Sequence, residues 1–300
     1  MTRFLLTHLC VFLMIPASCS ESDTKSIDTF AANGEVSEVA SDDDLMFMSP
    51  VWSPGGSRIA FTSGQYRGIW IVNPDGSDLR QITGAESAGY QFQWAPDDKT
   101  ITARIAHFDG PERYFAIVAY DIETGNKTYL MDFSKEPVDP PAKPAALPRD
   151  FGDRIALNAT YSPDSTKIAF QLMGEGVFVM MTDKQGSSPG EHQHPGPGEH
   201  RKAPYDDVLP EQEYRHLGPG EQPVWTPDSN HLIVSVSSDD GHYITASDLY
   251  TIRVKDGERT LLTGHTDLIA LHPTVSPDGR RIAFSDDKSG SICVMSISRP

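Results

Sequence analysis

Short runs of alternating apolar and polar residues, separated by Pro-containing turns, recur along the chain. In each copy an aromatic or apolar residue is followed by a small residue, Pro, and Asp or Gly, and then by an apolar strand. The turn prolines of the five copies are Pro54, Pro96, Pro163, Pro227 and Pro277. Pro presets φ at the first central turn position and Gly tolerates a positive φ. Each copy therefore predicts a β-hairpin whose alternating apolar residues face a core.

Two further apolar strands follow the hairpin in the first and fourth copies. After the first copy they lie at residues 69–72 and 79–83, with a turn at 73–76, and the same sequel recurs within residues 250–263. Four antiparallel strands per unit of about 40–45 residues are typical of a propeller blade. The chain is therefore expected to be all-β, a β-propeller of four-stranded antiparallel blades.

The repeated turn resembles that of a known family. Trp52, Trp94 and Trp225 begin Trp-Ser-Pro, Trp-Ala-Pro-Asp and Trp-Thr-Pro-Asp sequences, and Leu-Thr recurs in the fourth strand. These residues resemble the TolB-type β-propeller repeat. The resemblance covers residue 34 to the end and implies a fold without implying an activity. Five blades can be counted, while six, the number typical of that family, stays open.

The two ends of the chain are expected to meet in one blade. The fifth copy stops at its third strand, and residues 34–40 have the fourth-strand pattern. Pairing this N-terminal strand with the last blade would close the ring and remove two open edges. Residues 34–300 would then be a single propeller domain, with insertions at 135–156 and 184–213.

The N-terminus carries an export signal. Residues 1–18 comprise a basic start, an apolar stretch too short to span a bilayer and a small-residue ending, as in a secretory signal peptide. Residues 19–33 are expected to be a flexible tether. The Ala17-Ser18-Cys19 ending resembles a bacterial lipobox, which implies a lipid on Cys19 and a periplasmic protein anchored to the outer membrane. Ordinary cleavage with free release is the alternative.

Charge and cysteine content exclude several classes of protein. The chain has 42 acidic and 25 basic residues, for a net charge of −17. Such a charge repels phosphate backbones, so nucleic acid is not an expected partner. The three cysteines are too few for a disulfide scaffold or a Cys-rich zinc module.

One face of the propeller is the candidate binding surface. The loops between blades and those between second and third strands emerge opposite the Pro-containing turns, and binding groups gather on such variable loops. The residues assigned to this face are Asp42, Asp43, Asp44, Tyr90, His107, Asp109, His242, His265 and His272. Its histidines predict binding that changes between about pH 5.5 and 7.5. Scattered surface residues without a shared role are the alternative.

A metal site and an enzyme remain alternatives. His192, His194 and His200 in the second insertion have side chains that suit a transition metal, although a solvated His-rich loop is the simpler interpretation. No phosphate loop, dinucleotide fingerprint or zinc-protease motif occurs, and no cofactor is expected. We expect a monomeric, non-catalytic propeller that binds an envelope protein or glycan. The alternative is a carbohydrate-active or metal-dependent enzyme with its site at the channel mouth.

Overall fold

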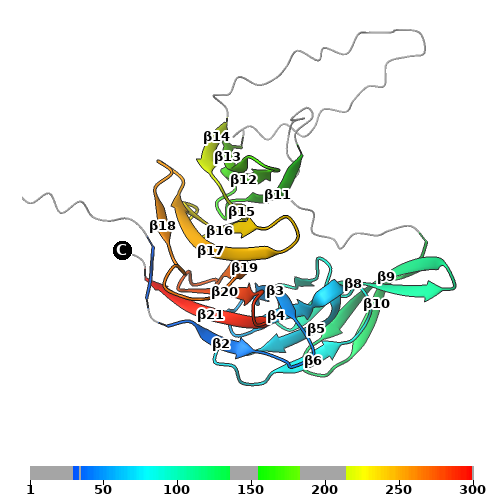
Figure 1. The fold of residues 1–300 in the computed structure, drawn as a ribbon. Helices are drawn as coiled ribbons and strands as arrows, with labels where there is room; N and C mark the ends of the chain where they lie inside the picture. Colours follow the sequence, from blue (N-terminus) through cyan, green and yellow to red (C-terminus); the bar gives the residue numbers. More distant parts are fainter. Residues whose placement is uncertain (1–29, 34, 136–154, 183–213, 299–300) are drawn as a thin grey trace, which may run out of the picture.

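The computed structural model describes residues 30–33, 35–135, 155–182 and 214–298, which form antiparallel β-sheets (Figure 1). The first sheet contains β3 (Phe47–Trp52), β4 (Ile59–Ser63), β5 (Arg67–Val72) and β6 (Arg80–Thr83), with the 3-10 turn η1 (Gly64–Tyr66) between β4 and β5. The second contains β7 (Gln93–Trp94), β8 (Thr100–Asp109), β9 (Glu112–Asp121) and β10 (Lys127–Ser134).

Three more sheets complete the described residues. The third contains β11 (Ala156–Tyr161), β12 (Lys167–Leu172), β13 (Gly176–Met181) and β14 (Tyr214–Gly218). The fourth contains β15 (Glu221–Trp225), β16 (His231–Asp239), β17 (Ile244–Arg253) and β18 (Arg259–Leu261). The fifth contains β19 (Ala270–Val275), β20 (Arg281–Asp286) and β21 (Ser291–Ser298), with β1 (Ala31–Ala32) and β2 (Ser37–Ala40) both paired to β21. The protein is therefore all-β, with five sheets each four strands wide, as expected of a β-propeller.

The first strands of the sheets lie at the centre of the molecule. β11 contacts β15, β15 contacts β19, and β19 contacts β3, and Figure 1 shows β15, β19 and β3 side by side. Apolar side chains fill the spaces between adjacent sheets. One core cluster joins the first and second sheets through Ile69, Ile71, Ile101 and Ala103. The apolar residues that alternate along each strand thus pack one sheet against the next.

The recurring tryptophans connect neighbouring sheets. Each indole N–H donates to a backbone oxygen in the first strand of an adjacent sheet. The pairs are Trp52 with Thr274 (3.3 Å), Trp94 with Val51 (3.2 Å) and Trp225 with Thr160 (3.1 Å). Each ring is buried or half-buried, so its repetition reflects packing between sheets.

The Pro-containing turns connect the first and second strands, as the sequence predicts. In the third sheet the Asp164 carboxylate accepts hydrogen bonds from the Ser162 hydroxyl (2.6 Å) and the Thr166 backbone N–H (3.0 Å). These bonds favour the ionised form and hold the pKa of Asp164 well below its ordinary value. Asp97, Asp228 and Asp278 accept similar bonds from hydroxyl groups of their own turns, so the acidic residue is part of the scaffold in the four turns that have one.

The N-terminal strand pairs with the last one. In β2, Ser37 and Glu38 lie opposite Val294 and Cys293 of β21. The flexible tether was expected to span residues 19–33. Residues 30–32 belong to the fold, so the tether ends earlier than predicted. Phe30 is 1% exposed and meets the ring of His231 edge-on at 4.9 Å. A large apolar side chain gains free energy by leaving water, which explains why this end is held.

The second and third sheets share no core among the described residues, unlike the other neighbouring sheets. None of the five hydrophobic clusters formed by the described residues combines side chains of β7–β10 with side chains of β11–β14. Exposed apolar residues flank this boundary: Tyr129, Leu130, Met131 and Phe133 on β10, and Leu157 and Tyr161 on β11. Most of the 135–156 insertion and all of the 184–213 insertion lie outside the described residues, although β14 begins at the predicted Tyr214. No helix of the described residues is long and apolar enough to cross a membrane.

Candidate functional site

Most residues assigned to the candidate binding face lie in connections, on the side opposite the Pro-containing turns. We call this side the loop face. Asp42, Asp43 and Asp44 lie between β2 and β3, Tyr90 between β6 and β7, His107 and Asp109 at the end of β8, His242 between β16 and β17, and His265 between β18 and β19. They come from four different connections and one strand end. The structure therefore distributes them over the face and does not gather them into one cluster.

His272 lies inside the fold and not in a loop. It belongs to β19, where its ring Nδ1 lies 2.9 Å from the Ser285 hydroxyl and its backbone N–H donates to Gln222 Oε1 at 3.2 Å. Burial disfavours the charged imidazolium and lowers the pKa of His272 below its ordinary value. His272 is thus unsuited to the pH-dependent surface role that the sequence suggested.

Several acidic residues of the loop face hold their own loops. The Asp42 carboxylate accepts the backbone N–H groups of Asp44 (2.9 Å) and Leu45 (3.1 Å). The Asp240 carboxylate accepts those of Tyr243 and His242, which lowers the pKa of Asp240. Among the described residues no three His, Cys, Asp or Glu side chains are close enough to hold a metal ion. The metal candidates His192, His194 and His200 lie outside the described residues, as does Cys19.

A feature that the sequence analysis missed recurs in every first strand or just before it. One non-glycine residue adopts a left-handed backbone conformation three positions before the aromatic or apolar residue of the repeat. These residues are Ser49, Gln91, Asn158, Gln222 and His272, with φ of 54°, 55°, 53°, 51° and 52°. In β3, β11, β15 and β19 the pairing register shifts there, as in a β-bulge. The detectable signal was a polar residue at this position in all five copies.

The bulge residues link neighbouring sheets through side-chain amides. Asn158 Nδ2 donates to Gln171 Oε1 at 3.0 Å, and the Gln222 backbone N–H reaches the same oxygen at 3.4 Å. Gln222 Oε1 in turn accepts the N–H of His272. Strained backbone of this kind concentrates at functional or architectural positions. Here the hydrogen bonds give it an architectural role, because they join the third, fourth and fifth sheets.

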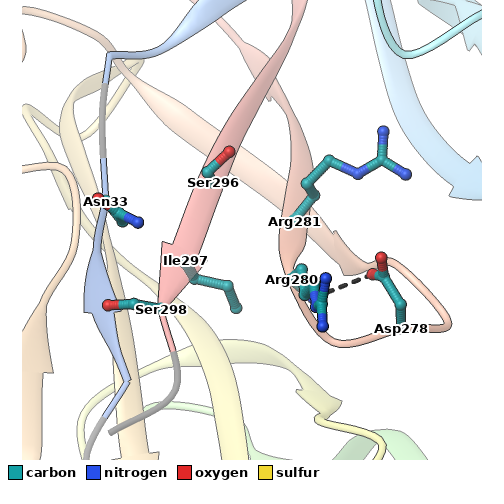
Figure 2. A pocket seen from close by; sticks show the side chains of 7 residues that line it. All are labelled: Asn33, Asp278, Arg280, Arg281, Ser296, Ile297 and Ser298. Atoms are coloured by element: carbon teal, nitrogen blue, oxygen red, sulfur yellow. Dashed lines mark hydrogen bonds between the residues drawn. The ribbon is translucent and has the colours of Figure 1, made fainter.

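Two cavities flank the fifth sheet. The first, of about 670 Å³, opens between β1, the end of β21 and the β19–β20 turn, as Figure 2 shows. One of its cations is already engaged, because the Arg281 guanidinium carbon lies 4.6 Å from the Trp52 ring centre. The backbone N–H of Arg280 donates to the Asp278 carboxylate and holds the β19–β20 turn. The second, of about 480 Å³, lies on the loop face beside His265 and Cys293.

Cys293 is an unreactive thiol. It is 4% exposed, and burial together with the nearby charges of Asp286 and Glu38 raises the pKa of Cys293 to about 12. A thiol that stays protonated is a poor nucleophile and a poor metal ligand. The second cavity therefore offers carboxylates and an imidazole, without a reactive group.

Two hairpins of the loop face are longer than the others. β8 and β9 pair from Thr100↔Asp121 out to Asp109↔Glu112, and β16 and β17 pair over a similar length. Figure 1 shows the β8–β9 hairpin extending away from the other sheets. It is attached to the β6–β7 connection by a hydrogen bond from the backbone N–H of Ala106 to the backbone oxygen of Glu86.

Six aromatic and arginine side chains form a row that begins in the connections of Tyr66 and Tyr90 and continues along one face of the β8–β9 hairpin; we call this row the aromatic–arginine ladder. Its members, in order, are Tyr66, Tyr90, Arg104, Phe115, Arg113 and Phe108. Successive members lie 5.4, 4.7, 4.9, 4.7 and 5.4 Å apart, measured between ring centres or from a guanidinium carbon to a ring centre. Phe108 is 53% exposed and Arg113 is exposed. Of the ladder, sequence reasoning selected Tyr90 alone, since cross-strand register brings the other members together.

Comparison with known proteins adds fold neighbours at low similarity. No family model and no curated protein matches the chain. Among solved structures, TolB from Acinetobacter baumannii is 14% identical with a TM-score of 0.33, over 83% of this chain and 54% of that one. An oligogalacturonate lyase in complex with manganese is 13% identical with a TM-score of 0.41, over 83% and 76%. The Cps50 (Swd1) β-propeller domain of Myceliophteria thermophila is 9% identical with a TM-score of 0.49, over 88% of this chain and 100% of that one.

The chain thus spans about half the length of the TolB structure that it resembles. Likenesses this weak assign no activity. The description of the fold rests on the strand pairings themselves.

Proposed function

We propose that the protein is a non-catalytic, exported β-propeller that binds a protein or glycan partner of the cell envelope through its loop face. The observation that carries the proposal is the long β8–β9 hairpin, which presents exposed aromatic and arginine side chains away from the scaffold. Exposed aromatic and arginine groups are the side chains enriched at binding hot spots. The Pro-containing turns on the opposite face are occupied by their own hydrogen bonds.

The finer architecture is part of this proposal: five blades in a closed ring. Support comes from the five sheets, from the contacts between first strands and from the pairing of β2 with β21. Deleting residues 34–41 removes that pairing and exposes the edge of β21. The thermal unfolding midpoint should then fall far more than for a trimmed loop. A midpoint within a couple of degrees of the wild type would contradict closure by this strand.

Anchoring through a lipid on Cys19 is also proposed, with the protein held at the periplasmic side of the outer membrane. The support is the lipobox-like sequence at 17–19. Cys19→Ala should move the protein from the membrane to the soluble periplasmic fraction, because the lipid supplies the attachment. An unchanged membrane fraction, or a wild type that incorporates no labelled palmitate, would disprove the anchor.

Partner binding is tested by locating it on one face. A glycan array and cross-linking in envelope extracts, followed by mass spectrometry, would supply the ligand. Its affinity is then compared between loop-face variants, such as His107→Ala and His242→Ala, and a turn-face control. Lys99→Gln serves as that control because Lys99 is exposed, whereas turn aspartates such as Asp164 stabilise the fold. Loss of binding in the control alone would show that the binding site lies on the face of the Pro-containing turns and not on the loop face.

The enzyme alternative has one observation in its favour. The polar groups of Gln171, Gln222 and His272 meet where the first strands converge, as polar groups do in a channel site. His272→Ala would then abolish an activity found by screening polysaccharides with added divalent metals. Absence of turnover in the screen would favour the binding role, whereas turnover that survives the substitution would place a catalytic site away from His272.

A further inference from the structure

The second cavity, beside His265 and Cys293, is formed where three distant parts of the chain meet on the loop face. The N-terminal segment that leads into β2, the β18–β19 connection and the β20–β21 hairpin each contribute to its wall. Its volume of about 480 Å³ lies within the range of ligand pockets, roughly 300–1,000 Å³. The cavity is therefore large enough for a small organic group.

The wall of the cavity is acidic. Four of its lining residues carry carboxylates: Glu35, Glu38, Asp267 and Asp286. The Lys288 ammonium binds Asp267, and no Lys or Arg is among the described residues that line the cavity. Burial and the charges of Asp286 and Glu38 raise the pKa of the Cys293 thiol, so the negative potential extends to the buried side of the cavity. The cavity therefore favours a cation.

Hydrogen bonds hold two of these carboxylates in place and leave a third free. Asp286 is 1% exposed, and its oxygens accept four hydrogen bonds from the loops around it. The oxygens of Glu38 accept the hydroxyls of Ser41 and Ser291, each at 2.7 Å. The exposed Glu35 has no hydrogen-bonding partner among the described residues. Because a carboxylate oxygen can accept two hydrogen bonds, Glu35 and Glu38 can both accept donors from a ligand, while Asp286 contributes its charge.

The buried side of the cavity is apolar. Val36 and Leu268 are half-buried and pack against the core cluster that contains Cys293. An aliphatic stem laid against such a surface leaves water while its charged end stays among polar groups, as lysine side chains do on protein surfaces. A metal ion would gain nothing from this surface, and among the described residues no three potential ligands are close enough to hold one. The combination of charge and apolar surface favours an organic cation.

An ammonium group suits these acceptors better than a guanidinium. A guanidinium pairs best with both oxygens of one carboxylate, and both oxygens of Glu38 already accept a hydroxyl. An ammonium is a compact charge whose three donors can each use a single acceptor position. We infer that the second cavity binds a primary ammonium group on an aliphatic stem, supplied by a free alkylamine or by a lysine side chain of a partner. This inference rests on the proposed binding role of the loop face and names the chemical group that the face recognises.

Small amines test the inference directly. The probe is pentylamine, while pentanol has the stem without the charge and methylamine has the charge without the stem. Calorimetry with the folded protein should show that pentylamine binds at least tenfold tighter than either control, with an affinity that falls as salt is added. Equal binding of pentanol or methylamine, or tighter binding of pentylguanidine, would overturn the inference. A lysine blocked at both ends distinguishes the sources: binding as tight as that of pentylamine supports a partner's lysine, and weaker binding supports a free amine.

Variants separate the cavity from the general acidity of the chain. Glu35→Gln should weaken pentylamine binding at least threefold, and the double variant with Glu38→Gln should weaken it at least tenfold. Glu123→Gln is the matched control, since Glu123 is exposed and pairs with Lys99 on the opposite face. Thermal unfolding of each variant is measured alongside, and Glu35→Gln alone decides the outcome if the double variant is unstable. An equal loss in the control, or no loss in Glu35→Gln, would overturn the inference.

The two proposals fail in different ways. If an envelope partner binds the loop face with an affinity that neither Glu35→Gln nor added pentylamine changes, the binding role stands and the ammonium inference is wrong. If no partner depends on the loop face while pentylamine still binds through Glu35, the proposed function is wrong and the cavity remains an amine site.

Discussion

The hairpins β8–β9 and β16–β17 occupy the same position in their sheets and have nearly the same length, but their surfaces differ. The first carries stacked aromatic rings and arginines on one face. The second carries serines bonded to one another and to the scaffold: Ser237 and Ser247 lie 3.1 Å apart, and Ser247 donates to the Ala270 oxygen at 2.8 Å. Its tip holds Asp239, Asp240 and the 77% exposed Tyr243.

The difference shows that the scaffold sets where a hairpin projects, whereas cross-strand side-chain pairs set what it can bind. The serine hairpin is tied to the connection before β19, because Ser247 also forms a bridge with Ile269. The ladder hairpin is attached to the β6–β7 connection through Ala106 and Arg113, and its tip extends beyond these contacts. Substitutions on the surfaces of the two hairpins should therefore differ in their effect on partner binding. Substitutions at the bases of the hairpins should differ in their effect on stability.

The largest loss of unfolding free energy should come from replacing the tryptophan at the base of each hairpin. Trp225 is 6% exposed and lies in the core cluster between the third and fourth sheets, whereas Trp94 is half-buried. Trp225→Ala should cost about 3–5 kcal/mol of unfolding free energy, as for other buried aromatics. Trp94→Ala should cost less, and urea unfolding of both variants measures the difference. Equal losses would show that the two bases are equivalent.

Removing the centre of the ladder should have the next largest effect. Phe115 is 9% exposed and contacts both guanidinium groups. Phe115→Ala should lower the unfolding free energy by about 2 kcal/mol, the scale of one buried aromatic side chain. Tyr243→Ala on the other hairpin is the matched variant and should change stability by less than about 0.5 kcal/mol. A similar loss in both would mean that Phe115 has no special role.

A smaller effect should appear on acidification, at the base shared by the fourth and fifth sheets. Burial lowers the pKa of His272 in the folded state, so the unfolded chain binds this proton more readily. Stability should then fall as the pH drops through the ordinary histidine range near 6.5. His272→Asn should flatten the dependence of the thermal midpoint on pH between 7 and 5. A slope identical to that of the wild type would contradict the assignment.

The smallest change in the thermal midpoint is expected from substitutions at the two hairpin tips. Asp240 accepts two backbone N–H groups in the β16–β17 turn, whereas the β8–β9 turn has Gly110 at φ 58°. Asp240→Ala should lower the thermal midpoint slightly more than Asp109→Ala does. Because the pKa of Asp240 is lowered in the folded state, this contribution is present at neutral pH and is lost as the pH falls below the ordinary aspartate range. Scanning calorimetry at pH 7 and pH 3 checks both statements.

The repeat predicted the strands because its physics is local. Pro-containing turns and apolar alternation fix the hairpins, and the strand at Tyr214 and the N-terminal strand β2 were found by the same pattern. The pattern stopped short of Phe30, whose burial depends on the distant His231. A single apolar residue outside a strand gives no periodic signal.

The ladder could not be predicted for a different reason. Arg104 and Phe115 meet through the register of β8 with β9, and Tyr66 and Tyr90 come from connections of another sheet. Strand parity assigned Tyr90, His107 and Asp109 to the loop face but cannot show which side chains touch. The residues with left-handed backbone occupy a position that is polar in every copy of the repeat, and this can be seen in the sequence. Their backbone conformation could not be predicted, because it follows from the bulges.

The direction of the tryptophan hydrogen bonds bears on how the chain folds during its synthesis. Trp94 and Trp225 donate to Val51 and Thr160, which precede them, so each bond can form as soon as its donor has left the ribosome. Trp52 donates to Thr274, so its acceptor is made 222 residues later. The first sheet to be synthesised is therefore the last to form its tryptophan hydrogen bond. Its contact with the fifth sheet cannot form until translation is nearly complete. For the exported protein proposed above, which would cross a membrane unfolded, that delay would keep the earliest sheet from closing too soon.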